Sequence, residues 1–388
     1  MHKKLFIALP LLLLLAALVF FGVVPAVVEK TRNPVLQPPP YGVNADAKRV
    51  HARLQVVDLH ADSLLWNRDL LKHGSRGQVD IPRLIEGGVA LQGFTIVTKS
   101  PKGLNIERND DRSDNITLLA LAERWPVKSW HSLAERALYQ ANKLNDTALR
   151  SRGRFTVIRS AGELDAYLFR RRFEPSITAG FIGVEGAHAL DADLGNIDRF
   201  FAAGIRMMAP THFFDNDIGG SAHGLAKGGL TEKGREMIRR MEARHMLLDL
   251  AHASPQTFDE ALAMATRPVV VSHTGVKGTC NNTRNLSDAQ LQAVAKNGGV
   301  VGIGYWDTAT CGSDAAAIAR AIVYAAKIAG IEHVGLGSDF DGSVATPFDA
   351  SGTPLITEAL LKQGMAEDDV ARVMGGNALR LLRQTLPP

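Results

Sequence analysis

Five apolar runs in this chain each end in an acidic residue or a histidine. One such run is ordinary, because many buried strands end in a polar group. Five of them, spread over almost the whole chain, predict a single site assembled from many strand ends. A (β/α)8 barrel builds its active site in this way, at the carboxyl ends of its parallel strands. The residues at these ends are His60 with Asp62, Glu185, His252, His273 and Asp339.

Strand and helix patterns alternate along the chain. Continuous Val, Ile and Leu runs indicate a parallel sheet that is buried on both faces. Eight strands are expected, the number that closes a barrel, at residues 54–59, 90–97, 179–184, 205–209, 246–251, 268–272, 299–304 and 333–338. Helices are expected at residues 230–244, 255–265, 287–297 and 314–329. The sequence therefore predicts an α/β fold, a (β/α)8 TIM barrel with a binuclear metal site at the C-terminal ends of its strands.

Residues 99–178 are too many for a simple crossover between the second and third strands. Within this stretch, residues 113–143 alternate between polar and apolar character. We interpret them as two helices inserted at the active-site end of the barrel.

An uncharged apolar run at residues 5–24 precedes the barrel. It is long enough to cross the roughly 30 Å core of a bilayer as a helix. Its length and the poor cleavage site after it favour a signal-anchor over a cleaved signal peptide for residues 1–28. Lys3 and Lys4 should remain in the cytoplasm. We therefore expect a membrane-anchored protein with its catalytic domain on the outer, periplasmic or extracellular face, or a secreted protein if the segment is cleaved.

The remaining chain is divided into a Pro-rich linker at residues 29–45 and one barrel domain at residues 46–388. The net charge is only +4, and the basic clusters are interspersed with acids, so no nucleic-acid partner is indicated. The two cysteines, Cys280 and Cys311, form an isolated pair. In an exported chain such a pair favours a disulfide over a metal site.

The residue types at the strand ends suit a metal site. His60 and Asp62 are two residues apart, so on a strand they point to the same side and can share one cation. The two carboxylate oxygens of Glu185 allow it to bridge two metals. His252 and His273 supply neutral imidazoles of the kind that Zn²⁺ accepts. Each residue alone could be a core histidine or a salt-bridged acid, and it is their joint occurrence that favours a metal.

Further candidates lie in the loops after the strands. Asp339 in GLGSDFDG competes with Asp341 for any catalytic role, and His212 competes with His223 in the following Gly-rich loop. Arg284 follows the sixth strand, where its planar fork could bind a substrate carboxylate, although a loop arginine is by default a solvated residue. The chain has no P-loop and no GxSxG nucleophile elbow.

The motifs DLHAD, GVEGAHAL, LDLAHAS, VVVSHTG, RNLSD, GLGSDFDG and GGNALRLL occur in this order along the chain. In this they resemble the membrane dipeptidase (renal dipeptidase) family, peptidase family M19 of the amidohydrolase superfamily, over about residues 56–382. The resemblance implies two Zn²⁺ ions per chain. It places His60 and Asp62 on the first metal, Glu185 as the bridge, and His252 and His273 on the second metal.

The same resemblance implies the activity and the remaining roles. It implies hydrolysis of dipeptides, including those with a C-terminal D-residue, by a hydroxide that bridges the two metals. A homodimer is a further expectation. The implied roles are oxyanion stabilisation by His212, carboxylate binding by Arg284 and proton handling by Asp339, and Cys280 and Cys311 match a loop-closing disulfide of the family. We also expect His212 and Tyr305 to contact the substrate.

Two alternatives remain from the sequence. Another metal hydrolase of the amidohydrolase type could act on lactones or phosphoesters. Those relatives usually bridge their metals with a carboxylated lysine, whereas this chain has Glu185. The second alternative is a metal-free, membrane-tethered binding protein of the same fold. The loss of a metal ligand would have indicated it, and every ligand is present.

Overall fold

The structure is a computed structural model that describes residues 2–388, with side chains from residue 11 onward. Its centre is a parallel sheet in the strand order β6, β5, β4, β2, β1, β9, β8, β7. An isolated parallel bridge between Asp249 and Val270 joins the two end strands, so the curled sheet forms the predicted barrel. The strands are β1 (Val56–Ala61), β2 (Val89–Val97), β4 (Thr178–Glu185), β5 (Ile205–Met208), β6 (Leu247–Leu248), β7 (Val270–Thr274), β8 (Val300–Ile303) and β9 (Val334–Leu336).

The barrel strands are buried along their whole length, as their continuous apolar sequences predict. Glycine is required where neighbouring strands come closest. A Cβ atom on Gly337 would lie 2.0 Å from the carbonyl oxygen of Ser272, and one on Gly302 would lie 2.2 Å from the same oxygen. The glycines therefore let β8 and the end of β9 approach the backbone of Ser272, a residue that reappears behind the active site.

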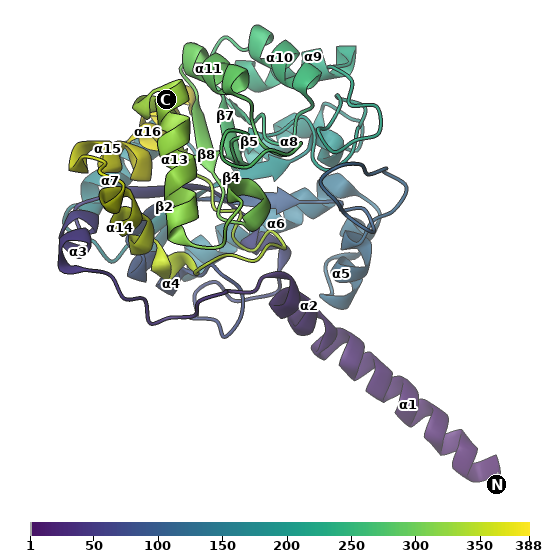
Figure 1. Ribbon diagram of the computed structural model, residues 1–388. Coiled ribbons are helices and arrows are strands. Elements are labelled where there is room, and N and C mark those ends of the chain that lie inside the picture. The colour runs from purple at the N-terminus through teal and green to yellow at the C-terminus, as the bar shows by residue number, and fades with distance from the viewer. Residues whose placement is uncertain (1) are drawn as a thin grey trace.

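Helices cover the outside of the barrel (Figure 1). The four that were predicted are present, with ends within two residues of the expected ones: α9 (Glu232–Ala243), α10 (Pro255–Met264), α11 (Asp288–Asn297) and α13 (Ala315–Ala329). Ser254 caps α10 by accepting a hydrogen bond from the amide of Thr257 at 3.0 Å. The other helices of the outer layer are α3 (Ala45–His51), α4 (Ile81–Glu86), α7 (Ala161–Arg171), α8 (Asn196–Ala202), α14 (Pro354–Lys362), α15 (Glu367–Ala371) and α16 (Asn377–Thr385).

The long connection between β2 and β4 contains the two expected helices, α5 (Ile116–Ala122) and α6 (Leu133–Arg150). It also contains a strand that the sequence pattern did not predict. This strand, β3 (Phe155–Val157), is three residues long and pairs in parallel with the first three residues of β4. So short a run has no usable periodicity, which explains why it was missed.

The N-terminal helix α1 (His2–Gly22) projects away from the barrel, and α2 (Val24–Arg32) connects it to the barrel surface (Figure 1). Within residues 2–388, Leu11–Arg32 is the one helical stretch long and apolar enough to cross a membrane. A signal sequence would pass the same test of length and composition. After α2 the chain follows the rim of the barrel, where the amide of Leu36 donates to the carbonyl of Thr346 at 2.9 Å.

Candidate active site

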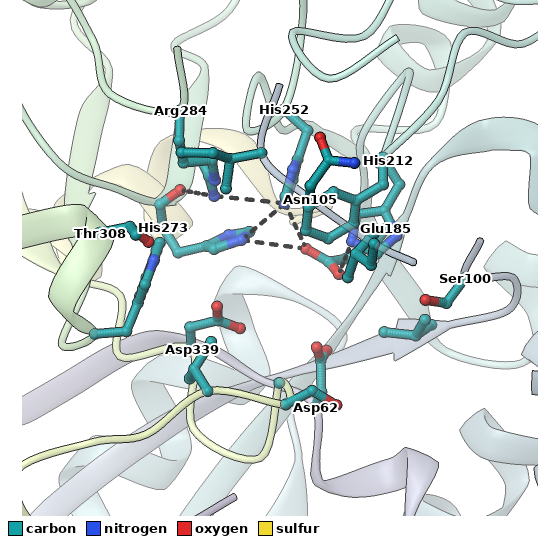
Figure 2. Close-up of a pocket in the computed structure, with 18 of the residues that line it drawn as sticks. Asp62, Ser100, Asn105, Glu185, His212, His252, His273, Arg284, Thr308 and Asp339 are labelled. Carbon is teal, nitrogen blue, oxygen red and sulfur yellow. Dashed lines mark hydrogen bonds and ion pairs between the residues drawn. The ribbon is translucent and has the colours of Figure 1, made fainter. Parts of the chain in front are cut away.

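A cavity of about 310 Å³ opens at the carboxyl ends of the barrel strands (Figure 2). Parallel strands all end at the same face of a barrel, so residues far apart in sequence meet there. His60 lies beneath the cavity and has no exposed surface. The predicted site residues that line the cavity are Asp62, Glu185, His212, His252, His273, Arg284 and Asp339.

Buried side chains that could hold a metal ion form three overlapping groups in this region. Within each group, one ligand atom per residue lies within 4.8 Å of the others. Glu185 and His60 each belong to two groups, so the three groups form one continuous cluster. The groups are His60 with Glu185 and His273, Glu185 with His212 and His252, and His60 with Asp62 and Asp339.

The Glu185 carboxylate stands at the centre of the cluster, and its two oxygens face different imidazoles (Figure 2). Its Oε1 lies 3.1 Å from Nε2 of His60, and 3.4 and 3.5 Å from Nε2 of His273 and His252. Its Oε2 lies 3.0 Å from Nε2 of His212. Because imidazoles lie near both of its oxygens, this carboxylate could bind one cation through each oxygen, together with the neighbouring histidines.

The cluster fits a divalent cation because several of its buried polar atoms have no hydrogen-bond partner in the protein. These atoms include Nε2 of His60 and Oε1 of Glu185, which lie 3.1 Å apart but are not aligned for a hydrogen bond, and Nδ1 of His252. The Nε2 atoms of His252 and His273 face each other at 3.0 Å. A buried polar atom without a partner costs about 1–3 kcal/mol. Imidazole nitrogens and carboxylate oxygens are the ligands that Zn²⁺ takes, and a cation among them would satisfy several of these atoms at once.

A second layer of polar residues fixes the orientation of the cluster. Ser272 lies between two histidines, with its Oγ 2.9 Å from Nδ1 of His60 and 3.0 Å from Nδ1 of His273. The same hydroxyl donates to Asp249 at 2.6 Å. On the other side, Thr95 donates to Oδ1 of Asp62 at 2.6 Å. Contacts of this kind set the ring orientation and basicity of metal ligands.

The sequence analysis missed Asp249 and Ser272. The available signal was a polar residue inside an otherwise apolar strand motif, in LDLAH and VVVSH. Both side chains are buried, and such groups are retained only where they find partners. Ser338 and Asp58 form a similar pair behind β1, since the amide of Ser338 donates to Oδ1 of Asp58 at 2.8 Å.

Burial and the concentration of charge shift the pKa values of the cluster. Burial raises the pKa of Asp62 to about 7, with a contribution from the neighbouring Glu185 charge. Burial lowers the pKa of His60, but the carboxylates of Glu185, Asp62 and Asp339 outweigh this effect and raise it to about 10. The metal-free cluster therefore holds protons at neutral pH, and a cation that binds there must displace them.

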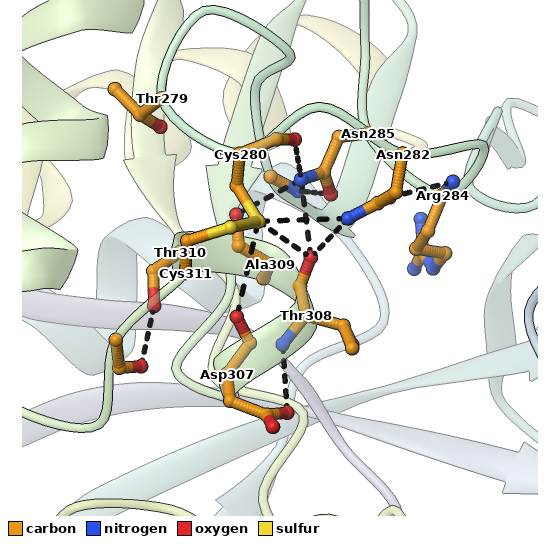
Figure 3. Close-up of a disulfide and its surroundings, with 12 residues drawn as sticks. Thr279, Cys280, Asn282, Arg284, Asn285, Asp307, Thr308, Ala309, Thr310 and Cys311 are labelled. Carbon is orange, nitrogen blue, oxygen red and sulfur yellow. Dashed lines mark hydrogen bonds between the residues drawn. A yellow bond between two sulfur atoms is a disulfide. The ribbon is translucent and has the colours of Figure 1, made fainter.

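Arg284 reaches the cavity from the loop after β7. Its side chain is 6% exposed, its Nη2 donates to the carbonyl of His273 at 2.7 Å, and its guanidinium carbon lies 5.5 Å from the centre of the Trp306 ring. The disulfide between Cys280 and Cys311, with Cα atoms 5.2 Å apart, ties this loop to the segment after β8, where Cys311 ends the short helix α12 (Asp307–Thr310) (Figure 3). This confirms the predicted pairing. The loop therefore presents a positive charge to the cavity from a covalently braced position.

Asp339 lies just beyond β9 and lines the cavity, with its Oδ1 3.9 Å from Nε2 of His60. Burial raises the pKa of Asp339 well above its ordinary value. The competing residue Asp341 is buried away from the cavity, where it pairs with Arg68 and accepts a hydrogen bond from Ser63 at 2.6 Å. The geometry therefore separates the two aspartates and leaves Asp339 beside the cluster.

The structure also decides between His212 and His223 as the residue that faces the cavity. His212 lines the cavity beside Glu185, whereas Nδ1 of His223 contacts the carbonyl of Ile106 at 2.6 Å. Burial lowers the pKa of His223 to about 3, which keeps its imidazole neutral.

Tyr305 is 1% exposed, packs against aromatic rings of the core and does not line the cavity. The neighbouring Trp306 lines it instead.

Comparison with known proteins gives one family match. The family described as membrane dipeptidase (peptidase family M19) matches residues 44–386. An uncharacterised dipeptidase of Schizosaccharomyces pombe is 35% identical over 217 residues, which cover 53% of this chain and 52% of that protein. The chain thus spans about half the length of this curated relative.

Solved structures share the fold over most of the chain. A dipeptidase described as a metallopeptidase of family M19 has a TM-score of 0.71 at 26% identity and covers 86% of this chain and 99% of its own. A metallopeptidase from Rhodobacter sphaeroides, liganded with a phosphinate mimic of the dipeptide L-Ala-D-Ala, has a TM-score of 0.68 with the same identity and coverage. The probable dipeptidase PvdM from Pseudomonas aeruginosa, at 19% identity and a TM-score of 0.73 over 88% of this chain and 97% of its own, is similar in fold.

Proposed function

The chain belongs to the membrane dipeptidase family, peptidase family M19, and from this premise we propose that it is a zinc-dependent dipeptidase. One observation carries the proposal. Five buried side chains that could bind metal meet at one place, from β1, β4, β7 and the chain just after β1 and β6. One of them, Glu185, contacts four imidazoles through its two carboxylate oxygens.

We assign the ligands of two Zn²⁺ ions as the sequence motifs imply. His60 and Asp62 would hold the first ion, His252 and His273 would hold the second, and Glu185 would contribute to both. When bound, the two ions supply Lewis acidity, which polarises a peptide carbonyl and acidifies a water molecule. The hydroxyl of Ser272 keeps the Nδ1 atoms of two ligands engaged, so that their Nε2 atoms remain directed at the cations.

Arg284 is proposed to bind the free C-terminal carboxylate of the substrate through its guanidinium fork. A buried arginine pairs more strongly with a carboxylate than an exposed one does, because water screens the two charges less there. The cavity of about 310 Å³ lies at the small end of the usual range for ligand sites, which suits a dipeptide. Together these features restrict the substrate to short peptides with a free carboxyl terminus.

His212 and Asp339 are proposed to act on the reacting groups. His212 faces the cavity and can donate a hydrogen bond to the oxygen that becomes negative as the carbonyl is attacked. Asp339, whose pKa burial raises, can carry a proton from the attacking water to the leaving amine. Tyr305 remains a predicted substrate contact, and its buried position suggests that it supports the cavity wall from behind.

The relatives suggest the substrate and the location. The Rhodobacter protein holds a mimic of a dipeptide with a C-terminal D-residue, so we propose that this chain also accepts D-residues at that position. The apolar N-terminal helix would anchor the enzyme with its barrel on the outer face of the membrane, or direct its secretion if cleaved. The disulfide agrees with an oxidising compartment. Assembly as a homodimer remains a prediction.

Hydrolysis of lactones or phosphoesters is less well supported. Relatives with those activities usually bridge their metals with a carboxylated lysine, and among the residues that the structure describes no lysine lines the cavity. A metal-free binding protein would have no use for the unpaired imidazole nitrogens of the cluster.

The experiment is a substrate panel on the full-length protein. L,L, L,D and Gly-containing dipeptides are compared with the matching dipeptide amides, a lactone and a phosphotriester, with and without a chelator. The proposal predicts chelator-sensitive cleavage of dipeptides and little cleavage of their amides. Cleavage of the lactone or the phosphotriester in preference to every dipeptide would contradict it.

A further inference from the structure

One wall of the cavity is a short loop after β9, here called the aspartate loop (residues 339–347). It contains Asp339, and four more of its residues line the cavity. Three of its non-glycine residues, Asp339, Asp341 and Ser343, have φ angles of +61°, +62° and +64°. A left-handed conformation costs a residue other than glycine roughly 1–2 kcal/mol. Such a loop keeps its shape only where contacts from its surroundings hold it.

Those contacts come from the segment that follows the membrane helix. The side-chain oxygen of Asn33 accepts a hydrogen bond from the amide of Ser343 at 2.8 Å. The amide of Leu36 donates to the carbonyl of Thr346 at 2.9 Å, and the amide of Thr346 donates to the carbonyl of Pro34 at 3.1 Å. The N-terminal segment therefore runs beside the aspartate loop like a short additional strand.

A buried glutamate strengthens this connection. Glu29 lies on α2 and is 1% exposed, although most of that helix is not buried. Its carboxylate forms ion pairs with Arg68 and Arg76. Arg68 forms a second ion pair with Asp341 in the middle of the aspartate loop. Asp341 also accepts a hydrogen bond from Ser63, which follows a proposed metal ligand in the chain.

Neither Glu29 nor Asn33 belongs to the region that matches the family, which begins at residue 44. We propose that both are positioning residues for the reaction. Through Arg68 and Ser343 they hold the aspartate loop so that Asp339 faces the metal cluster. The membrane-proximal segment is then a working part of the enzyme as well as its attachment. This inference rests on the proposed function, because it takes Asp339 as the group that handles the proton.

The obvious alternative is that these contacts merely stabilise the fold. The two roles differ in what they change in protein that remains folded. A structural role lowers the melting temperature and leaves turnover by the folded fraction intact. A positioning role lowers kcat with little change in KM, because the carboxylate-binding Arg284 is in another loop, and it loosens the aspartate loop even when no substrate is present.

The test uses the full chain in detergent with the variants Glu29→Gln and Asn33→Ala. The matched control is Glu367→Gln, which also removes a glutamate charge paired with two arginines, Arg49 at 2.6 Å and Arg53 at 2.5 Å, on the exposed surface. The readouts are kcat, KM and bound metal, together with hydrogen exchange of residues 339–347 followed by mass spectrometry.

We expect kcat to fall about tenfold in Glu29→Gln, because small displacements of reacting groups are costly, and about threefold in Asn33→Ala, the scale of one hydrogen bond. KM and metal content should stay near wild type. Exchange in the aspartate loop should be faster in both variants and unchanged in Glu367→Gln.

Unchanged kcat and unchanged exchange in folded Asn33→Ala and Glu29→Gln would overturn the proposal. If Glu29→Gln fails to fold, Asn33→Ala decides alone, since it removes no charge and only two side-chain hydrogen bonds, one from the amide of Ser343 and one to the carbonyl of Glu29. If the wild type cleaves no dipeptide, the proposed function fails, and the exchange measurement still decides whether the segment holds the loop.

Discussion

Two walls of the cavity are held in place by different means. The loop after β7 presents Arg284 and is tied to the segment after β8 by the disulfide between Cys280 and Cys311. The loop after β9 presents Asp339, contains no cysteine, and is held by hydrogen bonds and ion pairs to the N-terminal segment. The group proposed to bind the substrate is thus fixed by a covalent bond within the family domain. The group proposed to move the proton depends on chain outside that domain.

This difference has a practical consequence. Reduction of the disulfide should loosen the loop after β7 and leave the loop after β9 unchanged. Loss of the Glu29 ion pairs should loosen the loop after β9 and leave the loop after β7 unchanged. Both loops lie beside the same cluster of proposed metal ligands around Glu185. Substitutions in this cluster should therefore have the largest effects on activity.

The largest effect is expected from Glu185→Gln. The change removes the negative charge that both proposed ions share, so bound metal should be lost and kcat/KM should fall by about a thousandfold or more, roughly 4 kcal/mol of transition-state stabilisation. Elemental analysis and dipeptide hydrolysis check both parts. The matched control is Glu123→Gln, another buried glutamate, which should keep its metal. A Glu185→Gln enzyme with full metal and activity would remove the cluster from the mechanism.

The next largest effect is expected from replacing Arg284 in the loop after β7. Arg284→Met should weaken dipeptide turnover by roughly 2–5 kcal/mol, the scale of breaking a buried charge pair. Amidation of the substrate should cost the wild type a similar amount and cost the variant little more. These comparisons need kcat/KM for one dipeptide and its amide on both proteins. Equal losses on amidation in wild type and variant would show that Arg284 does not meet the carboxylate.

Removal of the covalent brace should have a similar or smaller effect, mainly on stability. The double variant Cys280→Ser, Cys311→Ser opens a loop with a sequence separation of 31 residues. In the chain-entropy model the free energy of unfolding should fall by about 3–4 kcal/mol. Urea unfolding measures this change. Hydrogen exchange should become faster in residues 275–287 and stay unchanged in residues 339–347; the opposite pattern would refute the comparison of the two walls.

The smallest effect is the pH dependence of metal binding. The pKa of Asp62 is raised to about 7 and that of His60 to about 10. Metal binds the deprotonated forms, so affinity should fall as pH falls. Between pH 7 and 10 the metal competes with the proton on His60, and below pH 7 it also competes with the proton on Asp62. Each proton changes the affinity for zinc by about tenfold, or 1.4 kcal/mol, per pH unit. Zinc titrations with a competing chelator at pH 6, 7 and 8 should show this steepening. A constant affinity would contradict it.

Much of the cavity floor could be predicted from sequence because it follows from local patterns. An apolar run that ends in His60, Glu185 or His273 indicates both the strand and the position of the side chain at its end. Parallel strands then bring these ends together without further information. The same reasoning found helices such as α10, whose N-cap Ser254 is a local signal.

The rest depends on contacts between distant residues, which one sequence does not display. Glu29 looks like a solvated charge next to the apolar N-terminal helix, and its partner Arg68 lies 39 positions later in a separate loop. Ser272 looks like a neutral strand residue until Asp249 and His60 are seen beside it. Burial and pairing, rather than periodicity, make these residues important.

The most direct test of the account is a zinc titration of the metal-stripped, full-length protein, with dipeptide hydrolysis as the readout. The account predicts no activity without metal and a rise that reaches its plateau at two zinc ions per chain. Full activity in the absence of metal, or a plateau at one ion, would contradict the claim that two ions share the cluster around Glu185.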